Sequence, residues 1–122
     1  MGTKKILIVD DDNRNIFALS AVLRSRGFEC PSCASAAEAI SMLKVEMHFD
    51  VLLLDMMMPD MDGYEAIPII RSLKDRSNLP IVAVTAQAMV GDREKCLEAG
   101  ADDYISKPVD IDKLFDIIGK LS

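Results

Sequence analysis

The stretch Val51-Leu52-Leu53-Leu54-Asp55 is a run of four apolar residues that ends in an acidic one. Ile6-Leu7-Ile8-Val9, which a pair of aspartates follows, has the same form, and Ile81-Val82-Ala83-Val84 leads into Thr85 in the same way. Continuous apolar runs of this length are typical of strands that are covered on both faces. The sequence therefore predicts a parallel sheet with helices on either side.

Shorter strands and amphipathic helices account for the segments around these runs. Phe28 to Cys33 and Asp102 to Ser106 are expected as two further strands. Three apolar stripes have the spacing of helices, and Gly27 and Gly100 mark plausible helix ends. The stripes are Ile16, Leu19, Val22 and Leu23; Ala36, Ala39, Ile40, Leu43 and Met47; and Ile111, Leu114, Phe115, Ile118 and Leu121.

A further helix is expected from Asp62 to about Lys74. Asp62 is a suitable N-cap and Glu65 its capping-box partner. Pro68 lies inside this helix, where it removes one backbone hydrogen bond and predicts a kink.

Alternating strands and helices with short connections predict an α/β fold: a single doubly wound (βα)5 domain over residues 1–122, flavodoxin-like. The best strand order for the five parallel strands is 2-1-3-4-5. In such sheets, ligands bind at the carboxyl ends of the strands, near the switch point in strand order.

Composition excludes several classes of protein. With 20 acidic and 14 basic residues the net charge is -6, and this argues against direct nucleic-acid binding, which needs a basic surface. No apolar stretch is long enough for a membrane segment, and Met1 to Lys5 leads into a strand-like run rather than a signal sequence. We therefore expect a cytoplasmic protein.

Three cysteines are present, two of them with C-x-x-C spacing at Cys30 and Cys33. A redox motif needs its first thiol at a helix N-terminus. Here Ser35 and Glu38 make a better helix start beyond both thiols, so ordinary strand-end cysteines are favoured over redox or zinc chemistry.

Polar residues follow the predicted strands at one edge of the sheet. They are Asp10 and Asp11 after the first strand, Asp55 after the third, Thr85 after the fourth and Lys107 after the fifth. Carboxylates gathered without a cation would repel one another, so the cluster indicates a hard divalent cation, best Mg²⁺.

A carboxylate beside magnesium can also act as a nucleophile toward phosphorus and form an acyl phosphate. Such transfer needs cationic groups and hydrogen-bond donors around the phosphoryl group. Lys107 can pair with Asp55 and later with a phosphoryl oxygen, and the Thr85 hydroxyl can donate to another.

The chain resembles response-regulator receiver domains over essentially its whole length. The matching segments are Ile8–Asp12, Asp55–Gly63 with the pattern D-x-x-M-P-x-M-D-G, Val84–Ala86 and Gly100–Pro108. The resemblance implies that Asp55 is phosphorylated by a histidine kinase or a histidine phosphotransfer protein. It also implies that Asp11 binds magnesium directly, Asp10 through water, and the backbone carbonyl of Met57 as a further ligand.

The same resemblance implies a switch in which Thr85 turns toward the phosphoryl group and Tyr104 swings inward. The face formed by the fourth helix, fifth strand and fifth helix would carry the output, with dimerisation on phosphorylation one outcome. For Tyr104 the alternative is a half-buried tyrosine with its hydroxyl at the surface. The methionines around the phosphorylation loop are either adaptable packing, slightly favoured, or an apolar contact for a kinase.

Segments 12–19 and 85–93 resemble receivers fused to hybrid histidine kinases, so the chain is either a piece of such a kinase or a stand-alone regulator. We expect a switch rather than an enzyme. The alternative is a small haloacid-dehalogenase-like phosphohydrolase with Asp10 as nucleophile and Asp12 as acid, but after Lys107 only one helix remains to supply the acidic pair that this family needs. A flavodoxin-like cofactor binder would need a Ser/Thr/Gly-rich loop where three aspartates stand.

Overall fold

Five strands and five helices alternate along the chain in a computed structural model that describes residues 4–45, 48–73, 78–86 and 91–121. The strands are β1 (Ile6–Val9), β2 (Ser32–Cys33), β3 (Val51–Asp55), β4 (Ile81–Thr85) and β5 (Asp103–Ser106). The helices are α1 (Asn13–Ser25), α2 (Ala36–Val45), α3 (Gly63–Ser72), α4 (Asp92–Ala99) and α5 (Ile111–Leu121). Within the described ranges, no helix is long and apolar enough to cross a bilayer.

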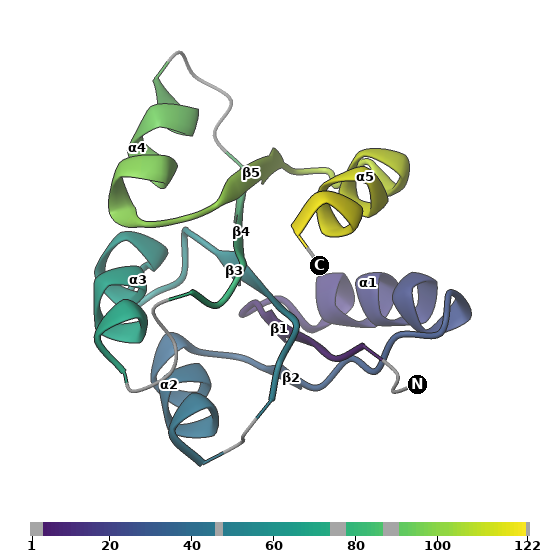
Figure 1. Cartoon of the computed structure of the whole chain (residues 1–122), viewed down its shortest axis with the longest axis horizontal. Helices are drawn as coiled ribbons and strands as arrows, with labels where there is room; N and C mark the ends of the chain where they lie inside the picture. Colours follow the sequence, from purple (N-terminus) through teal and green to yellow (C-terminus); the bar gives the residue numbers. More distant parts are fainter. Residues whose placement is uncertain (1–3, 46–47, 74–77, 87–90, 122) are drawn as a thin grey trace.

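The strands form one parallel sheet in the order β2-β1-β3-β4-β5, which confirms the predicted fold class and strand order. Helices α1 and α5 cover one face, and α2, α3 and α4 cover the other (Figure 1). The order reverses between β1 and β3, so the switch point of the sheet lies between the two strands that end in the acidic residues.

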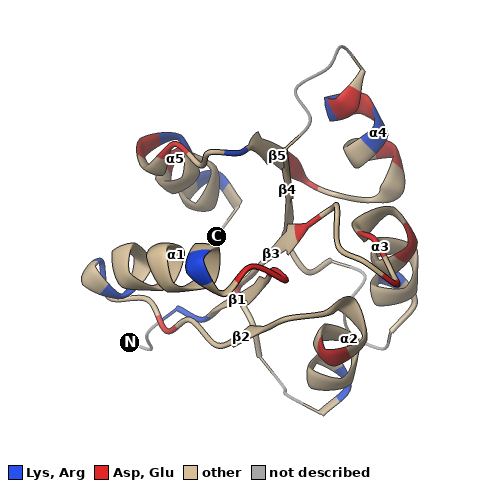
Figure 2. Cartoon of the chain, turned by 180° about the vertical axis from the view of Figure 1, so that it is seen from behind, with Lys and Arg blue, Asp and Glu red and all other residues tan. Residues whose placement is uncertain are grey.

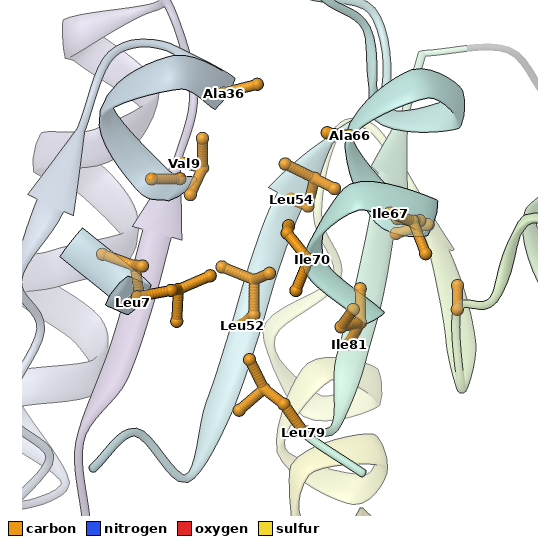
Figure 3. Close-up of a cluster of buried hydrophobic side chains, with 14 of the residues drawn as sticks. Leu7, Val9, Ala36, Leu52, Leu54, Ala66, Ile67, Ile70, Leu79 and Ile81 are labelled. Carbon is orange, nitrogen blue, oxygen red and sulfur yellow. The ribbon is translucent and has the colours of Figure 1, made fainter. Parts of the chain in front are cut away.

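Each strand sends alternate side chains into two separate cores, because successive residues of a strand point to opposite faces. Leu7, Leu52 and Ile81 belong to the core under α2 and α3, and Figure 3 shows Ile70 of α3 beside Leu52 and Leu54. The residues between them on the strands pack with α1 and α5 on the other face. All three long strands are buried throughout, as their unbroken apolar sequences predict.

The second strand is shorter than expected. The carbonyls of Glu29, Pro31 and Cys33 all accept hydrogen bonds from the first strand's edge, yet only Ser32–Cys33 is a regular strand, preceded by an isolated bridge between Lys5 and Glu29. Pro31 has no N–H and cannot donate the return bond of the ladder. The prediction of a strand over residues 28–33 was therefore wrong in extent, although the segment does run beside β1.

The predicted helix caps are present. The Asp62 side chain accepts from the Glu65 N–H at 2.9 Å and starts α3, while Ser35 accepts from the Glu38 N–H at 3.2 Å and starts α2. Helix α3 continues through Pro68, which is exposed, and ends at Ser72. The predicted kink stays a prediction, and the expected end at Lys74 and the stripe residue Met47 lie outside the described residues.

Helices α3 and α4 approach each other closely at the end of α4. Gly100 caps this helix in the left-handed region, with φ 118°. A Cβ on Gly100 would lie 2.8 Å from Cγ2 of Ile67 on α3, closer than such atoms normally approach. A glycine is therefore needed here both for backbone conformation and for contact between the two helices.

Candidate functional site

The predicted site residues come together at the carboxyl edge of the sheet. Asp10 directly follows β1, Asp55 ends β3 and Thr85 ends β4, while Lys107 directly follows β5. Because the strands are parallel, their carboxyl ends meet at one edge. Figure 2 shows the acidic segment after β1 beside the carboxyl end of β3.

Three carboxylates converge there. Ligand atoms of Asp10, Asp11 and Asp55 all lie within 4.8 Å of one another. Asp10 and Asp55 are buried, with 2% and 3% of their surfaces exposed, whereas Asp11 is exposed. Oxygen donors of this kind suit a hard divalent cation such as Mg²⁺, so the donor set fits the predicted metal.

Lys107 supplies the only positive charge that ion pairs place against this cluster in the described ranges. Its Nζ lies 3.4 Å from Oδ2 of Asp10 and 3.3 Å from Oδ2 of Asp55. Burial alone would lower the pKa of Lys107, but the charges of Asp55 and Asp10 outweigh it and raise the pKa. Lys107 is therefore fully charged at neutral pH and partly compensates the three carboxylates.

Asp55 sits in an environment that opposes its ionisation. Burial raises the pKa of its carboxyl group, and the charge of Asp10 raises it further. The Met57 N–H, which donates to Oδ1 of Asp55 at 3.0 Å, and the Lys107 ammonium act in the opposite direction. The pKa of Asp55 therefore remains above its ordinary value. The positive charge of a bound cation would favour the ionised carboxylate here.

Asp10 is held by donors that were not predicted from the sequence. Its Oδ1 accepts from the Asp12 N–H at 2.9 Å, and its Oδ2 accepts from Nδ2 of Asn15 at 2.9 Å. Asn15 lies in the first turn of α1, so its reach back to the end of β1 depends on how the helix is set on the sheet. Only the spacing of an amide side chain after the acidic pair could have pointed to it.

Asp12 takes no part in the carboxylate cluster. It is the N-cap of α1, and its Oδ1 accepts from the Arg14 N–H at 2.9 Å, a bond that lowers the pKa of the Asp12 carboxyl. A phosphohydrolase of the haloacid dehalogenase type would need this residue as an acid facing the nucleophile. The capping role thus removes the acid from the alternative site.

The two predicted switch residues lie on neighbouring strands, β4 and β5, in different settings. Thr85 is buried, with 1% exposed, and its carbonyl accepts from the Lys107 N–H at 2.8 Å. Tyr104 is partly buried and packs against the core under α2, α3 and α4. Partial burial of Tyr104 fits both the switch role and the half-buried alternative, and its inward movement stays a prediction.

The methionines of the loop that follows Asp55 divide into two groups. Met56 and Met58 are buried in the core, and Met61 packs against it, as the packing interpretation expects. Met57 differs, because 49% of it is exposed beside the site. Its backbone is the part that faces Asp55, and its side chain is free to contact another molecule.

The C-x-x-C cysteines lie on opposite faces of the sheet. Cys30 is buried in the core under α1 and α5, whereas Cys33 packs against the core under α2, α3 and α4. Both are free thiols. Burial raises the pKa of Cys30, and burial with the nearby charge of Glu38 raises the pKa of Cys33 to about 11. These surroundings suit packing rather than thiolate chemistry, as predicted.

Comparison with known proteins gives a consistent family. The model of the family described as "Response regulator receiver domain" matches residues 6–119. The chain is 37% identical over 113 residues to the signal transduction histidine-protein kinase BarA of Escherichia coli K12, covering 93% of this chain and 12% of that protein. It is 34% identical over 132 residues to histidine kinase 3 of Arabidopsis thaliana, covering 92% of this chain and 13% of the relative. The chain thus spans about an eighth of the length of these kinases.

Solved structures agree in fold. The receiver domain of the sensor histidine kinase PA1611 from Pseudomonas aeruginosa, which has a magnesium ion coordinated in its active-site cleft, is 35% identical with a TM-score of 0.89, and 98% of both chains is covered. A chain from the co-crystal structure of the Saccharomyces cerevisiae phosphotransfer protein Ypd1 and the Ssk1 receiver domain is 28% identical with a TM-score of 0.88, covering 98% of this chain and 88% of the other. With the doubly wound sheet and the acidic cluster at its carboxyl edge, these matches show that the chain belongs to the response-regulator receiver domains of two-component phosphorelays.

Proposed function

We propose that Asp55 is the phosphoacceptor of this receiver domain, which occupies residues 1–122, and that a histidine kinase or histidine phosphotransfer protein is the donor. The observation that carries the proposal is the position of Asp55. Its buried carboxylate lies within 4.8 Å of two other carboxylates and 3.3 Å from the Lys107 ammonium. Positioning and charge neutralisation are what phosphoryl transfer requires of a protein.

Asp10, Asp11, Asp55 and the carbonyl of Met57 would hold magnesium. When bound, magnesium would neutralise the carboxylates and the phosphoryl oxygens during transfer. In the transfer, an oxygen of Asp55 forms a bond to phosphorus as the bond from phosphorus to the donor's imidazole nitrogen breaks. The bonding pair returns to that nitrogen, and the imidazole leaves as a neutral ring when its other nitrogen carries a proton. Lys107 then exchanges its contact with the Asp55 carboxylate for one with a phosphoryl oxygen.

The phosphorylated state would be read out by Thr85 and Tyr104. Thr85 ends β4, the strand that pairs with the phosphoacceptor strand β3. Its carbonyl accepts a hydrogen bond from the Lys107 N–H. If the Thr85 hydroxyl donates to the phosphoryl group, the inward position of Tyr104 becomes more favourable than in the unmodified protein. The face of α4, β5 and α5 then changes and becomes the output surface, where a phosphorylation-dependent dimer would form.

The donor would dock beside the carboxylate cluster. Phe17, in the second turn of α1, has 77% of its surface exposed, and Met57 follows the phosphoacceptor by two residues with 49% exposed. These apolar side chains suit the helices of a phosphotransfer protein, such as the one that binds the Ssk1 receiver.

We propose further that the domain acts in the cytoplasm, as a switch rather than a turnover enzyme, without binding nucleic acid directly.

Intact-protein mass spectrometry tests the phosphoacceptor. Incubation with acetyl phosphate and Mg²⁺ should add one phosphoryl group to the wild type and none to Asp55→Asn, and chelation of the metal should abolish the adduct. Asp116→Asn, a change at an exposed aspartate of α5, is the matched control and should be labelled normally. An adduct that persists in Asp55→Asn but disappears in Asp10→Asn would instead support the phosphohydrolase alternative.

A further inference from the structure

We infer that Asn15 is a positioning residue of the site, which holds Asp10 so that Asp11 remains the open ligand for magnesium. This inference rests on the proposed function of the carboxylate cluster. It starts from one contact, the hydrogen bond of 2.9 Å from Nδ2 of Asn15 to Oδ2 of Asp10. A carboxylate can only accept, so the amide nitrogen of Asn15 must be the atom that faces it.

The Asp10 carboxylate is almost saturated by protein donors. Two carboxylate oxygens offer about four acceptor positions. Oδ1 receives the Asp12 N–H at 2.9 Å, while Oδ2 receives both the Asn15 amide at 2.9 Å and the Lys107 ammonium at 3.4 Å. Little acceptor capacity is left for direct contact with a metal, which favours an indirect role for Asp10.

Asp11 has the opposite surroundings. Its side chain is exposed, and in the described part of the chain no hydrogen bond or ion pair engages its carboxylate. The adjacent carboxylates therefore differ through their partners: one is buried and held, and the other is open. Among the donors to Asp10, Asn15 is the neutral side chain, so it fixes the carboxylate without adding a positive charge that would repel a cation.

The start of helix α1 determines where Asn15 lies. Asn15 stands third in α1, whose start is fixed by the N-cap Asp12. The Asp12 cap thus fixes the first turn of α1, and this turn directs the Asn15 amide toward Asp10. Partners that orient metal ligands in this way typically change metal affinity by about 10–100-fold when removed.

Asn15→Ala tests the inference through magnesium binding, followed by NMR titration of backbone amides. The dissociation constant for Mg²⁺ should rise about 10-fold. Alanine has a higher helix propensity than asparagine, so thermal unfolding in EDTA should stay close to that of the wild type. Asn13→Ala, at an exposed position in the same turn, is the matched control and should leave the affinity unchanged.

A double-mutant cycle shows whether Asn15 acts through Asp10. In an Asp10→Ala background, Asn15→Ala should change the affinity by less than about twofold, because its partner is gone. The Cγ resonance of Asp10 in metal-free protein gives a second reading: it should move in Asn15→Ala and stay in Asn13→Ala. Unchanged affinity and an unmoved resonance in Asn15→Ala would overturn the inference while leaving Asp55 phosphorylation intact. Failure of the proposed function would appear separately, as the absence of an Asp55 adduct in the wild type.

Discussion

Replacing Asp55 by asparagine should stabilise the metal-free domain, because the ionised carboxylate of the wild type lowers the free energy of unfolding. At an effective dielectric constant of about 20, two carboxylate oxygens within 4.8 Å of each other repel by at least about 3 kcal/mol, and the Lys107 contact at 3.3 Å returns about 5 kcal/mol. The exposed Asp11 is screened by water, so the repulsion comes mainly from Asp10 and does not by itself exceed the Lys107 attraction. Burial of the Asp55 carboxylate is the largest cause of its raised pKa and adds several kcal/mol of the same sign as the repulsion, which makes the balance unfavourable by about 2 kcal/mol.

We therefore expect Asp55→Asn to gain about 2 kcal/mol at pH 7 in EDTA, which for a domain of this size raises Tm by about 6–8 °C. The amide keeps an oxygen that can accept the Met57 N–H, so little other structure is lost. Saturating Mg²⁺ should shrink the difference, since the wild type gains binding energy that the variant largely lacks.

The effect should also depend on pH. The folded-state pKa of Asp55 is raised above its unfolded value of about 3.9. Protonation therefore favours the folded wild type: this contribution is fully present below the unfolded pKa and is lost as pH rises through the folded pKa. The advantage of Asp55→Asn should be largest above the folded pKa and should decline as pH falls toward about 4.

Differential scanning calorimetry in EDTA and in Mg²⁺, at pH 7 and near pH 4, measures each of these differences. Asp116→Asn is the matched control, because Asp116 is exposed on α5, and it should change Tm by no more than about 1–2 °C. A variant that is no more stable than the wild type in EDTA at pH 7 would refute the charge argument.

Four further substitutions test other contacts and surfaces of the structure. Lys107→Met should abolish labelling by acetyl phosphate and should lower Tm in EDTA but much less in Mg²⁺, because it leaves the carboxylates uncompensated; equal losses in both buffers would contradict this. Phe17→Ala should slow transfer from a phosphorylated phosphotransfer protein by about 10-fold without changing labelling by acetyl phosphate, measured side by side, and a parallel loss in both would contradict a docking role. Gly63→Ala should cost several kcal/mol in urea unfolding, about 3 or more, since its Cβ would lie 2.2 Å from Sδ and 2.9 Å from Cα of Met56. Gly119→Ala meets nothing within 4 Å on α5 and should instead stabilise by about 0.5–1 kcal/mol.

The strand order and the composition of the site were predictable from the chain itself. Apolar runs such as Val51–Leu54 need cover on both faces, which selects a parallel sheet between helices. Once that sheet is accepted, parallel strands bring their carboxyl ends to one edge, so Asp10, Asp55 and Lys107 had to meet. The resemblance to receiver domains added the roles of Asp11 and Met57, which spacing alone leaves open.

The extent of β2 was predicted less well. Phe28 to Cys33 has strand-like composition, and the presence of Pro31 was not enough to predict that the regular strand would be only Ser32–Cys33. A proline can be accommodated at the edge of a sheet, and its cost depends on whether its missing N–H faces a neighbour. Here it faces β1, as the bonds of the flanking residues show, and the regular strand is cut to two residues.

The sequence by itself determined the fold class, the edge of the sheet that carries the chemistry and the residue types gathered there, because strand periodicity and chain order act locally. Only the tertiary structure decided which of the three consecutive aspartates face the site: Asp12 turns away to cap α1, and Asn15 reaches back to Asp10. It also separated Cys30 from Cys33 across the sheet. These outcomes depend on side-chain rotamers and on the setting of helices against strands, which are fixed by packing between elements distant in sequence rather than by local pattern.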